Sequence, residues 1–182
     1  MSLKKIETLG AALAPFKEIG ENWGILSAGN EEKFNSMTVS WGAAGVLWSA
    51  PCVFVFVRPQ RYTYEFTESC DRFSLSLMPE GFHKKMAVFG SKSGRDTDKY
   101  AESGLTPAFY DGVPYTAEAQ KVFICRKIAA ADITPEWFTD HKFDIENYPR
   151  KDYHRMYIGS RSRMSCRSFR VNKPAVYVPR SE

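Results

Sequence analysis

Apolar and small polar residues alternate without interruption between Ser36 and Trp41. Because successive side chains of a strand point to opposite faces, this pattern predicts a strand with one hydroxyl face and one apolar face. The hydroxyl face carries Ser36, Thr38 and Ser40, and the apolar face carries Met37, Val39 and Trp41. A row of hydroxyl groups on one strand face indicates either a ligand or a polar barrel interior.

This strand begins a run without charged residues that extends from Ser36 to Val57. The run is long enough to suggest a membrane span, but a helix in lipid would not alternate between polar and apolar positions. Gly42, Gly45 and Pro51 interrupt it, and the segment from Cys52 to Arg58 is apolar, as in a strand that is covered on both faces. The sequence therefore predicts a strand, a loop and a second strand, and no membrane span.

Hydrophobic spacing predicts the other elements. The pattern of a strand occurs in WGILSAGN, RFSLSLM, KVFICRKIAAADI and YHRMYIGS, and that of a helix in YTYEFTES and from Phe82 to Gly90. Gly90 is expected to cap its helix, and a further short helix is expected to begin after Asp96 or Thr97 and to stop at Gly104. A polar, aromatic-rich excursion, residues 134–152, precedes the last strand. Many strands with few short helices predict a mainly β fold, an antiparallel barrel with helical decoration.

Composition narrows the class of protein. The chain has 182 residues, of which 43% are hydrophobic, and this fits one compact domain and excludes disorder. The N-terminal residues are too polar for an export signal, so we expect a cytoplasmic protein. Four cysteines and three histidines are scattered without the spacing of zinc ligands, so we expect no metal site.

The net charge of +4 is concentrated at the C-terminal end of the chain. From Gly159 onward six basic residues face one acidic residue, so the rest of the chain sums to −1. The rest of the chain is thus nearly neutral, and a basic tail of this kind is typically solvated or faces a partner. We therefore expect no nucleic-acid partner. The glycine motifs that bind phosphates in dinucleotide-binding and P-loop proteins are absent from the sequence.

Two segments nevertheless have the chemistry to hold an anion. In RPQRYTYE, Arg61, Tyr62 and Thr63 stand at the start of a predicted helix, where N–H groups, a guanidinium and a hydroxyl can converge on a phosphate. The alternative is an exposed turn with an incidental arginine. In SKSGRDTDK, several donors and a permissive glycine precede a short helix, and the alternative is a solvated charged loop.

Together with NSMTVSWG, these segments resemble the flavin reductase-like FMN-binding proteins. This family includes flavoredoxin and has the FMN-binding split barrel, an antiparallel Greek-key barrel. The similarity extends from about Trp23 to about Gly159 through NSMTVSWG, RPQRYTYEF, FGSKSGRDTDKY, ESGLTP and DYHRMYIG. We treat residues 1–182 as a single domain, in which residues 160–182 form a divergent basic tail.

The resemblance implies where the cofactor binds. In the family, the first of these segments lies along the isoalloxazine, the second helps to hold the phosphate and ribityl chain, and the Ser-Gly-Arg-Asp loop closes over the cofactor. These roles are carried to Asn35, Ser36, Met37, Thr38, Ser40, Trp41, Arg61, Tyr62, Thr63, Lys92, Ser93, Gly94 and Arg95. The resemblance also makes His154 a catalytic candidate, as a donor to the anionic reduced ring. A satisfied core or surface histidine is the alternative.

The function implied is that of an oxidoreductase, a homodimer that binds FMN and passes reducing equivalents from NADH or NADPH to or through the flavin. Two alternatives stay open. One is a flavoredoxin-like electron-transfer protein that holds FMN tightly and meets a redox protein partner, and the other is a non-redox binder of FMN or another small ligand. The sequence has no recognisable nicotinamide motif, so it does not separate the reductase from the electron-transfer protein.

Overall fold

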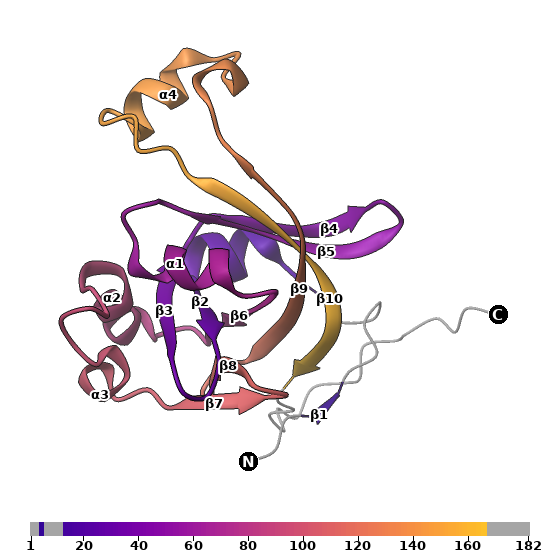
Figure 1. Cartoon of the computed structure of the whole chain (residues 1–182), viewed down its shortest axis with the longest axis vertical. Coiled ribbons are helices and arrows are strands. Elements are labelled where there is room, and N and C mark those ends of the chain that lie inside the picture. Colours follow the sequence, from indigo (N-terminus) through magenta and orange to yellow (C-terminus); the bar gives the residue numbers. More distant parts are fainter. Residues whose placement is uncertain (1–3, 6–12, 167–182) are drawn as a thin grey trace.

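The computed structural model describes the main chain of residues 4–5 and 13–166 and the side chains of residues 13–160. The strands are β1 (Lys4–Lys5), β2 (Gly24–Gly29), β3 (Phe34–Val39), β4 (Gly42–Leu47), β5 (Ala50–Val57), β6 (Arg72–Leu77), β7 (Pro107–Tyr110), β8 (Val113–Thr116), β9 (Lys121–Asp132) and β10 (Arg155–Cys166). The helices are a π-helix (Phe16–Glu21), α1 (Tyr62–Ser69), α2 (His83–Ser91), α3 (Lys99–Ser103), a 3-10 turn (Pro135–Trp137) and α4 (His141–Asn147). The mainly β class with helical decoration is thereby confirmed (Figure 1).

The main sheet is antiparallel and curls into a barrel. Its strand order is β3-β2-β6-β9-β10-β5-β4, with β1 added beside β10, and β7 and β8 form a separate hairpin. The end strands β3 and β4 are separated in the chain only by Ser40 and Trp41. Because consecutive Cα atoms are only ~3.8 Å apart, the two ends of the sheet must come together. The barrel is therefore split along a seam between β3 and β4, which are not paired with each other.

The predicted loop between the two uncharged strands is wrong, because residues 42–47 form the edge strand β4, paired with β5. Trp48 and Ser49 connect the two strands with φ angles of 51° and 58°, the backbone of a tight primed turn. The glycines of β4 are tolerated because β4 is an edge strand. Pro51 of β5 lies just before Cys52, the residue at which the pairing of β5 with β10 begins. The missing N–H of Pro51 therefore leaves that ladder intact.

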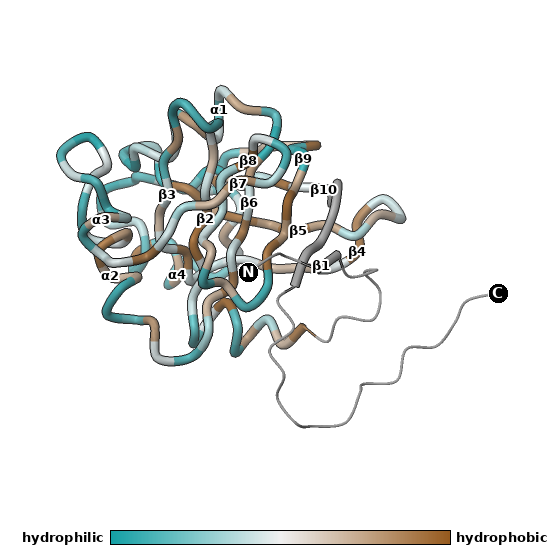
Figure 2. Tube along the Cα trace, turned by 90° about the horizontal axis from the view of Figure 1, so that it is seen from below, coloured by the Kyte–Doolittle hydropathy of each residue, from teal (hydrophilic) through white to brown (hydrophobic). Residues whose placement is uncertain are grey.

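Both faces of the central strands are covered by apolar side chains. One buried cluster fills the inside of the curled sheet and includes Leu26, Phe73 and Tyr157. A second cluster, which includes Ile25 and Phe89, lies between the outer face of the sheet and α2, α3 and the β7–β8 hairpin. Figure 2 shows these apolar strands at the centre and hydrophilic segments around α1 and α3. Burial on both faces explains why the strands contain nearly continuous apolar runs.

The helix ends agree only in part with the sequence prediction. Gly90 does not cap α2, which continues to Ser91, and a Cβ at position 90 would lie 3.7 Å from Cβ of Thr38. The cap of α3 is Asp98, whose carboxylate accepts the N–H groups of Tyr100 and Ala101. Gly104 ends α3 in the left-handed conformation, as predicted (φ 63°). No helix of the described residues is both long and apolar enough to cross a membrane.

The aromatic-rich excursion between β9 and β10 projects from the barrel and carries α4 (Figure 1). The carboxylate of Asp140 caps α4 by accepting the N–H of Lys142. At the base of the excursion, the N–H of Ile133 donates to the carbonyl of His154 over 2.9 Å, next to the pair Asp132 and Arg155 at the ends of the two strands. β10 continues past Gly159 to Cys166, and residues 167–182 of the basic tail lie outside the described residues.

Candidate functional site

A cavity of about 240 Å³ opens at the seam of the barrel. Its lining combines the last residues of β3, the β3–β4 connection, the end of β5, the segment between β5 and α1, and the residue before β10. The lining residues are Met37, Thr38, Val39, Ser40, Trp41, Phe56, Arg58, Arg61 and His154. Four of the residues predicted for the isoalloxazine are therefore brought together here, with neutral and apolar groups along β3.

A second cavity, of about 160 Å³, adjoins the first at Arg61. It lies between the start of α1, the end of α2 and the loop before α3. Its lining consists of Gln60, Arg61, Tyr62, Thr63, Gly90, Ser91, Lys92, Ser93, Gly94 and Lys99. The residues predicted to hold the phosphate and those predicted for the loop over the cofactor line this cavity, with the exception of Arg95. Lys99, which the sequence analysis missed, lines it as well.

Lys99 is a buried cation at the inner wall of the second cavity. Its side chain is 5% exposed, and its ammonium donates to the main-chain carbonyl of Ser36 and lies 5.7 Å above the ring of Phe89. Burial and the nearby charge of Arg61 lower the pKa of Lys99 to about 8. Burying an ammonium without a counter-ion costs free energy, so this arrangement indicates an anion in the cavity.

Arg61 joins the two cavities and closes the end of α2. Its Nη1 and Nη2 groups donate to the carbonyls of Gly90 and Phe89 over 2.6 and 2.5 Å. Burial lowers the pKa of Arg61 below its usual value. Within residues 13–160, no carboxylate forms an ion pair with Arg61 or Lys99. The second cavity therefore carries one buried and one half-buried positive charge, and neither has an acidic partner within residues 13–160.

The contacts of Arg61 give it a structural role as well. We expect Arg61→Ala to lower the free energy of unfolding by about 1–3 kcal/mol, because two carbonyls at the end of α2 lose charged donors. Binding of both FMN and riboflavin should weaken, because the loop after α2 loses its support. Chemical denaturation and flavin titrations measure this, with the exposed Arg95→Ala as the control. Unchanged stability in Arg61→Ala would contradict the capping role.

The loop before α3 is held over the second cavity by ion pairs at its outer side. Lys92 pairs with Glu102, and Arg95 pairs with Glu65 of α1. The guanidinium of Arg95 also lies 4.4 Å from the ring centroid of Tyr62, so this charge packs on α1 outside the cavity. A Cβ at Gly94 would lie 2.2 Å from Oδ1 of Asn35, so the loop can approach β3 only with glycine there.

Asn35 and Ser36 lie away from the seam cavity, because their side chains are used inside the protein. The amide of Asn35 donates to the hydroxyl of Thr63 over 2.9 Å and so links β3 to the start of α1. The hydroxyl of Ser36 lies 2.7 Å from that of Ser27 and 3.0 Å from that of Tyr100. Thr38 lines the seam cavity, but its hydroxyl donates to the carbonyl of Met86 over 2.5 Å.

The other end of the seam cavity is aromatic. The rings of Trp41 and His154 have centroids 5.0 Å apart, and His154 is only 8% exposed. Burial and the charge of Arg58 lower the pKa of His154 to about 4, against the opposing effect of Asp152. His154 is therefore neutral at pH 7, and Arg58 itself is compensated by Asp152 over 2.5 Å.

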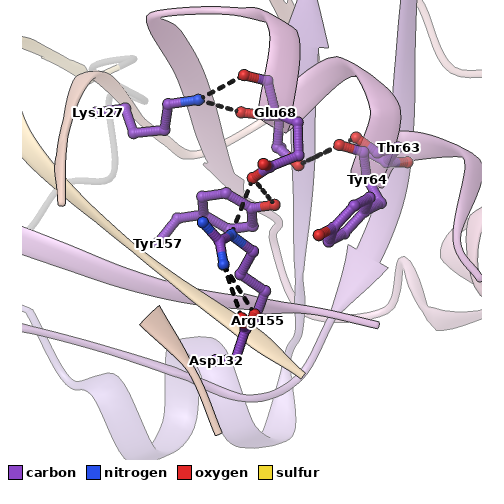
Figure 3. A network of polar contacts seen from close by, with 8 residues as sticks. Thr63, Tyr64, Glu68, Lys127, Asp132, Arg155 and Tyr157 are labelled. Carbon is purple, nitrogen blue, oxygen red and sulfur yellow. Dashed lines mark hydrogen bonds and ion pairs between the residues drawn. The ribbon is translucent and has the colours of Figure 1, made fainter. Parts of the chain in front are cut away.

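A polar network fastens the C-terminal end of α1 to the barrel (Figure 3). Glu68 accepts from Nε of Arg155 over 3.0 Å and from the hydroxyl of Tyr157 over 2.7 Å. Arg155 also forms a two-pronged contact with Asp132, and Lys127 donates to the carbonyls of Thr67 and Glu68. Because α1 is anchored at this end, its first residues are held at the second cavity.

A third and larger cavity, of about 600 Å³, shares Trp41 with the seam cavity. It lies under the excursion, and most of its lining is aromatic or aliphatic. The lining residues are Trp41, Ile133, Trp137, Phe138, Thr139, Asp140, Phe143, Asn147 and Tyr148. No lysine or arginine is among them, so this cavity suits an uncharged, planar group better than an anion.

Comparisons with solved structures identify the fold around these cavities. Flavoredoxin from Methanosarcina acetivorans matches with a TM-score of 0.63 at 19% identity, over 80% of this chain and 68% of that chain. The FMN-binding domain of a flavin reductases-like enzyme from Shewanella baltica matches with 0.64 at 16% identity, over 91% and 77%. The styrene monooxygenase flavin reductase from Pseudomonas putida S12 matches with 0.60 at 21% identity, over 82% and 81%.

A search of curated protein sequences gives no match. The shared fold confirms the predicted split barrel, with the cavities described above at its seam. The sequence pattern of the flavin reductase like domain matches residues 16–181. This chain thus belongs to the flavin reductase-like family of FMN-binding split-barrel proteins.

Proposed function

We propose that this protein binds FMN along the seam of its barrel and passes reducing equivalents from NADH or NADPH to or through it. The observation that carries the proposal is the pair of cations, the buried Lys99 and the half-buried Arg61, at one end of two adjoining cavities. A terminal phosphate dianion is the ligand that compensates two such charges. The neutral, apolar and aromatic wall at the other end suits a flavin ring.

The donor set fits FMN from one end to the other. The hydroxyl of Ser40 and the main chain of β3 offer polar contacts for the pyrimidine edge of the ring, and Met37 and Trp41 offer apolar contact. Arg61, Lys99 and the N–H groups at the start of α1 offer donors for the phosphate. Held there, FMN would supply the redox chemistry, which is to take up reducing equivalents and release them again. The protein holds the ring in position and shields it from water.

A homodimer is part of the proposal, because apolar side chains around the seam are exposed in the single chain. Apart from Phe16 (93%) in the π-helix, the large apolar residues that are exposed in the described part of the chain are Val46 (73%), Ile145 (69%), Trp48 (68%), Phe143 (57%), Trp137 (51%) and Trp41 (45%). They belong to the β4–β5 hairpin, the excursion and the seam itself. Exposed apolar groups gathered around a ligand site favour a covering partner, and a second copy is the simplest one.

A second candidate function is supported by the third cavity. Its lining lacks the lysines and arginines that would hold the pyrophosphate of NADH or the additional phosphate of NADPH. This favours a flavoredoxin-like electron carrier, in which tightly held FMN receives electrons from a redox protein. A non-redox binder of FMN is the remaining alternative on the same fold.

Anaerobic stopped-flow spectroscopy separates these functions. We first expect the purified protein to take up FMN, with a shift in flavin absorbance during titration. The FMN-loaded protein is then mixed with NADH, with NADPH and with reduced ferredoxin. Bleaching of the flavin by a nicotinamide supports the reductase, and bleaching by ferredoxin alone supports the carrier. Folded protein that shows no FMN response at saturating FMN would overturn the whole proposal.

A further inference from the structure

Tyr148 and His154 form a buried pair beside the seam cavity. The hydroxyl of Tyr148 lies 2.8 Å from Nδ1 of His154, and the two side chains are only 4% and 8% exposed. Tyr148 follows α4 in the excursion, whereas His154 precedes the first residue of β10. The pair therefore joins the excursion to the barrel at the cavity wall.

The direction of this hydrogen bond follows from what each group can do. Burial raises the pKa of Tyr148, so the phenol keeps its O–H proton at neutral pH. Among the described residues, Nδ1 of His154 is the only hydrogen-bond partner of the phenol O–H. If Nδ1 carried the proton, the buried O–H would have no acceptor, which is unfavourable. The phenol must donate, and Nδ1 must accept.

The imidazole is neutral, so an accepting Nδ1 places its single proton on Nε2. The charged groups near it, Arg58 and Asp152, pair with each other and leave the ring uncharged. Within residues 13–160, Nε2 has no hydrogen-bond partner, and His154 lines the seam cavity. An N–H that lines a cavity and has no acceptor among the described residues is available to a ligand.

We propose that Tyr148 is a positioning residue that holds His154 as the Nε2–H tautomer, so that this N–H donates to an acceptor atom of the ligand in the seam cavity. The identification of that acceptor with an oxygen or nitrogen of the flavin ring rests on the proposed function. His154 does not have to gain or lose a proton to make this hydrogen bond, because its neutral imidazole is present from mildly acidic to alkaline pH. His154 thus acts by donating a hydrogen bond, and no proton leaves it.

The test is long-range proton–nitrogen NMR on the full chain labelled with ¹⁵N-histidine, without flavin at pH 7. The chain has three histidines, and the pair of signals lost in His154→Gln identifies His154. We expect one nitrogen signal of a protonated Nε2 and one of an accepting Nδ1. Tyr148→Phe should convert this pattern into a mixture of tautomers. Tyr153→Phe is the matched control, because its hydroxyl donates to Asp144 over 2.8 Å although its ring lies 4.8 Å from Tyr148.

A proton on Nδ1 in the parent protein, or an unchanged pattern in Tyr148→Phe, would overturn the inference. Addition of FMN then tests the ligand side separately. A shift of the Nε2 signal on saturation with FMN supports the contact, and a shift that also occurs in Tyr148→Phe with equal size would overturn the positioning role. Because the tautomer is measured without flavin, a protein that fails to bind FMN affects only the proposed function.

Discussion

Lys99→Met should weaken the binding of FMN by about one to two orders of magnitude and leave the binding of riboflavin nearly unchanged. A desolvated, charge-assisted hydrogen bond to a phosphate contributes roughly 1.5–3 kcal/mol to binding. Riboflavin has no phosphate, so its binding does not depend on this hydrogen bond. Methionine preserves most of the length of the buried side chain without its charge. Fluorescence titrations of the two flavins measure the difference.

Lys92→Met is the matched control, because Lys92 lines the same cavity but is half-exposed and paired with Glu102. It should change FMN binding much less than Lys99→Met. Equal losses of FMN and riboflavin in Lys99→Met would show that Lys99 supports the fold, and the assignment of the second cavity to the phosphate would fail.

The same lysine gives the affinity for FMN a pH dependence. Without ligand the pKa of Lys99 is about 8, and a bound dianion raises it, so binding above pH 8 takes up a proton. Affinity for FMN should therefore be highest between about pH 6, the second pKa of the phosphate, and pH 8. It should fall above pH 8, where Lys99 loses its proton, and below about pH 6, where the phosphate gains one. The stability of the ligand-free protein should depend on pH in the opposite direction. The unfolded chain holds this proton up to the usual pKa of 10.5, so stability rises with pH between about 8 and 10.5.

Gly159→Ala should destabilise the protein by roughly 1–3 kcal/mol or more, because it overpacks the centre of the barrel. A Cβ at position 159 would lie 2.5 Å from Cζ of Phe73 and 2.6 Å from Cβ of Cys125. The strand cannot move away, since Gly159 is paired with Val53 on one side and Lys127 on the other.

Gly45→Ala is the control within the same sheet. Nothing lies within 4 Å of a Cβ at position 45 in the edge strand β4, so the change in stability should stay within about 0.5 kcal/mol. Chemical denaturation of both variants measures the comparison. Similar stabilities for the two would show that the packing around Gly159 is looser than described.

Much of the fold could be predicted, because strand periodicity is local information. The alternation from Ser36 to Trp41 predicted β3, and apolar runs predicted β5, β6 and β9. The β4 strand was missed because its glycines were interpreted as breakers, and an edge strand tolerates them. The β7–β8 hairpin was also missed, although the pair Asp111 and Gly112 at its turn, with φ angles of 51° and 73°, is a strong hairpin signal.

The candidate site was predicted less completely, because burial is decided by tertiary packing. Arg95 and Lys99 are both basic residues near the start of one short helix, and nothing local distinguishes them. Packing against β3 buries Lys99, whereas Arg95 pairs with Glu65 outside. The hydroxyl of Ser36 faces Ser27 because of the register between β2 and β3, which no single strand reveals. Tyr148 reaches His154 only because the excursion folds back on itself.

The base of the excursion has a consequence for how such proteins diversify. The backbone hydrogen bond between Ile133 and His154 holds its entry and exit side by side, next to the last pair of the barrel ladder. Evolution or design can therefore lengthen, shorten or exchange residues 134–153 without shifting a strand. Any replacement must still supply a phenol for His154 and a partner for Arg58. The barrel can therefore stay constant while the excursion varies, and with it the lining of the third cavity beside the seam.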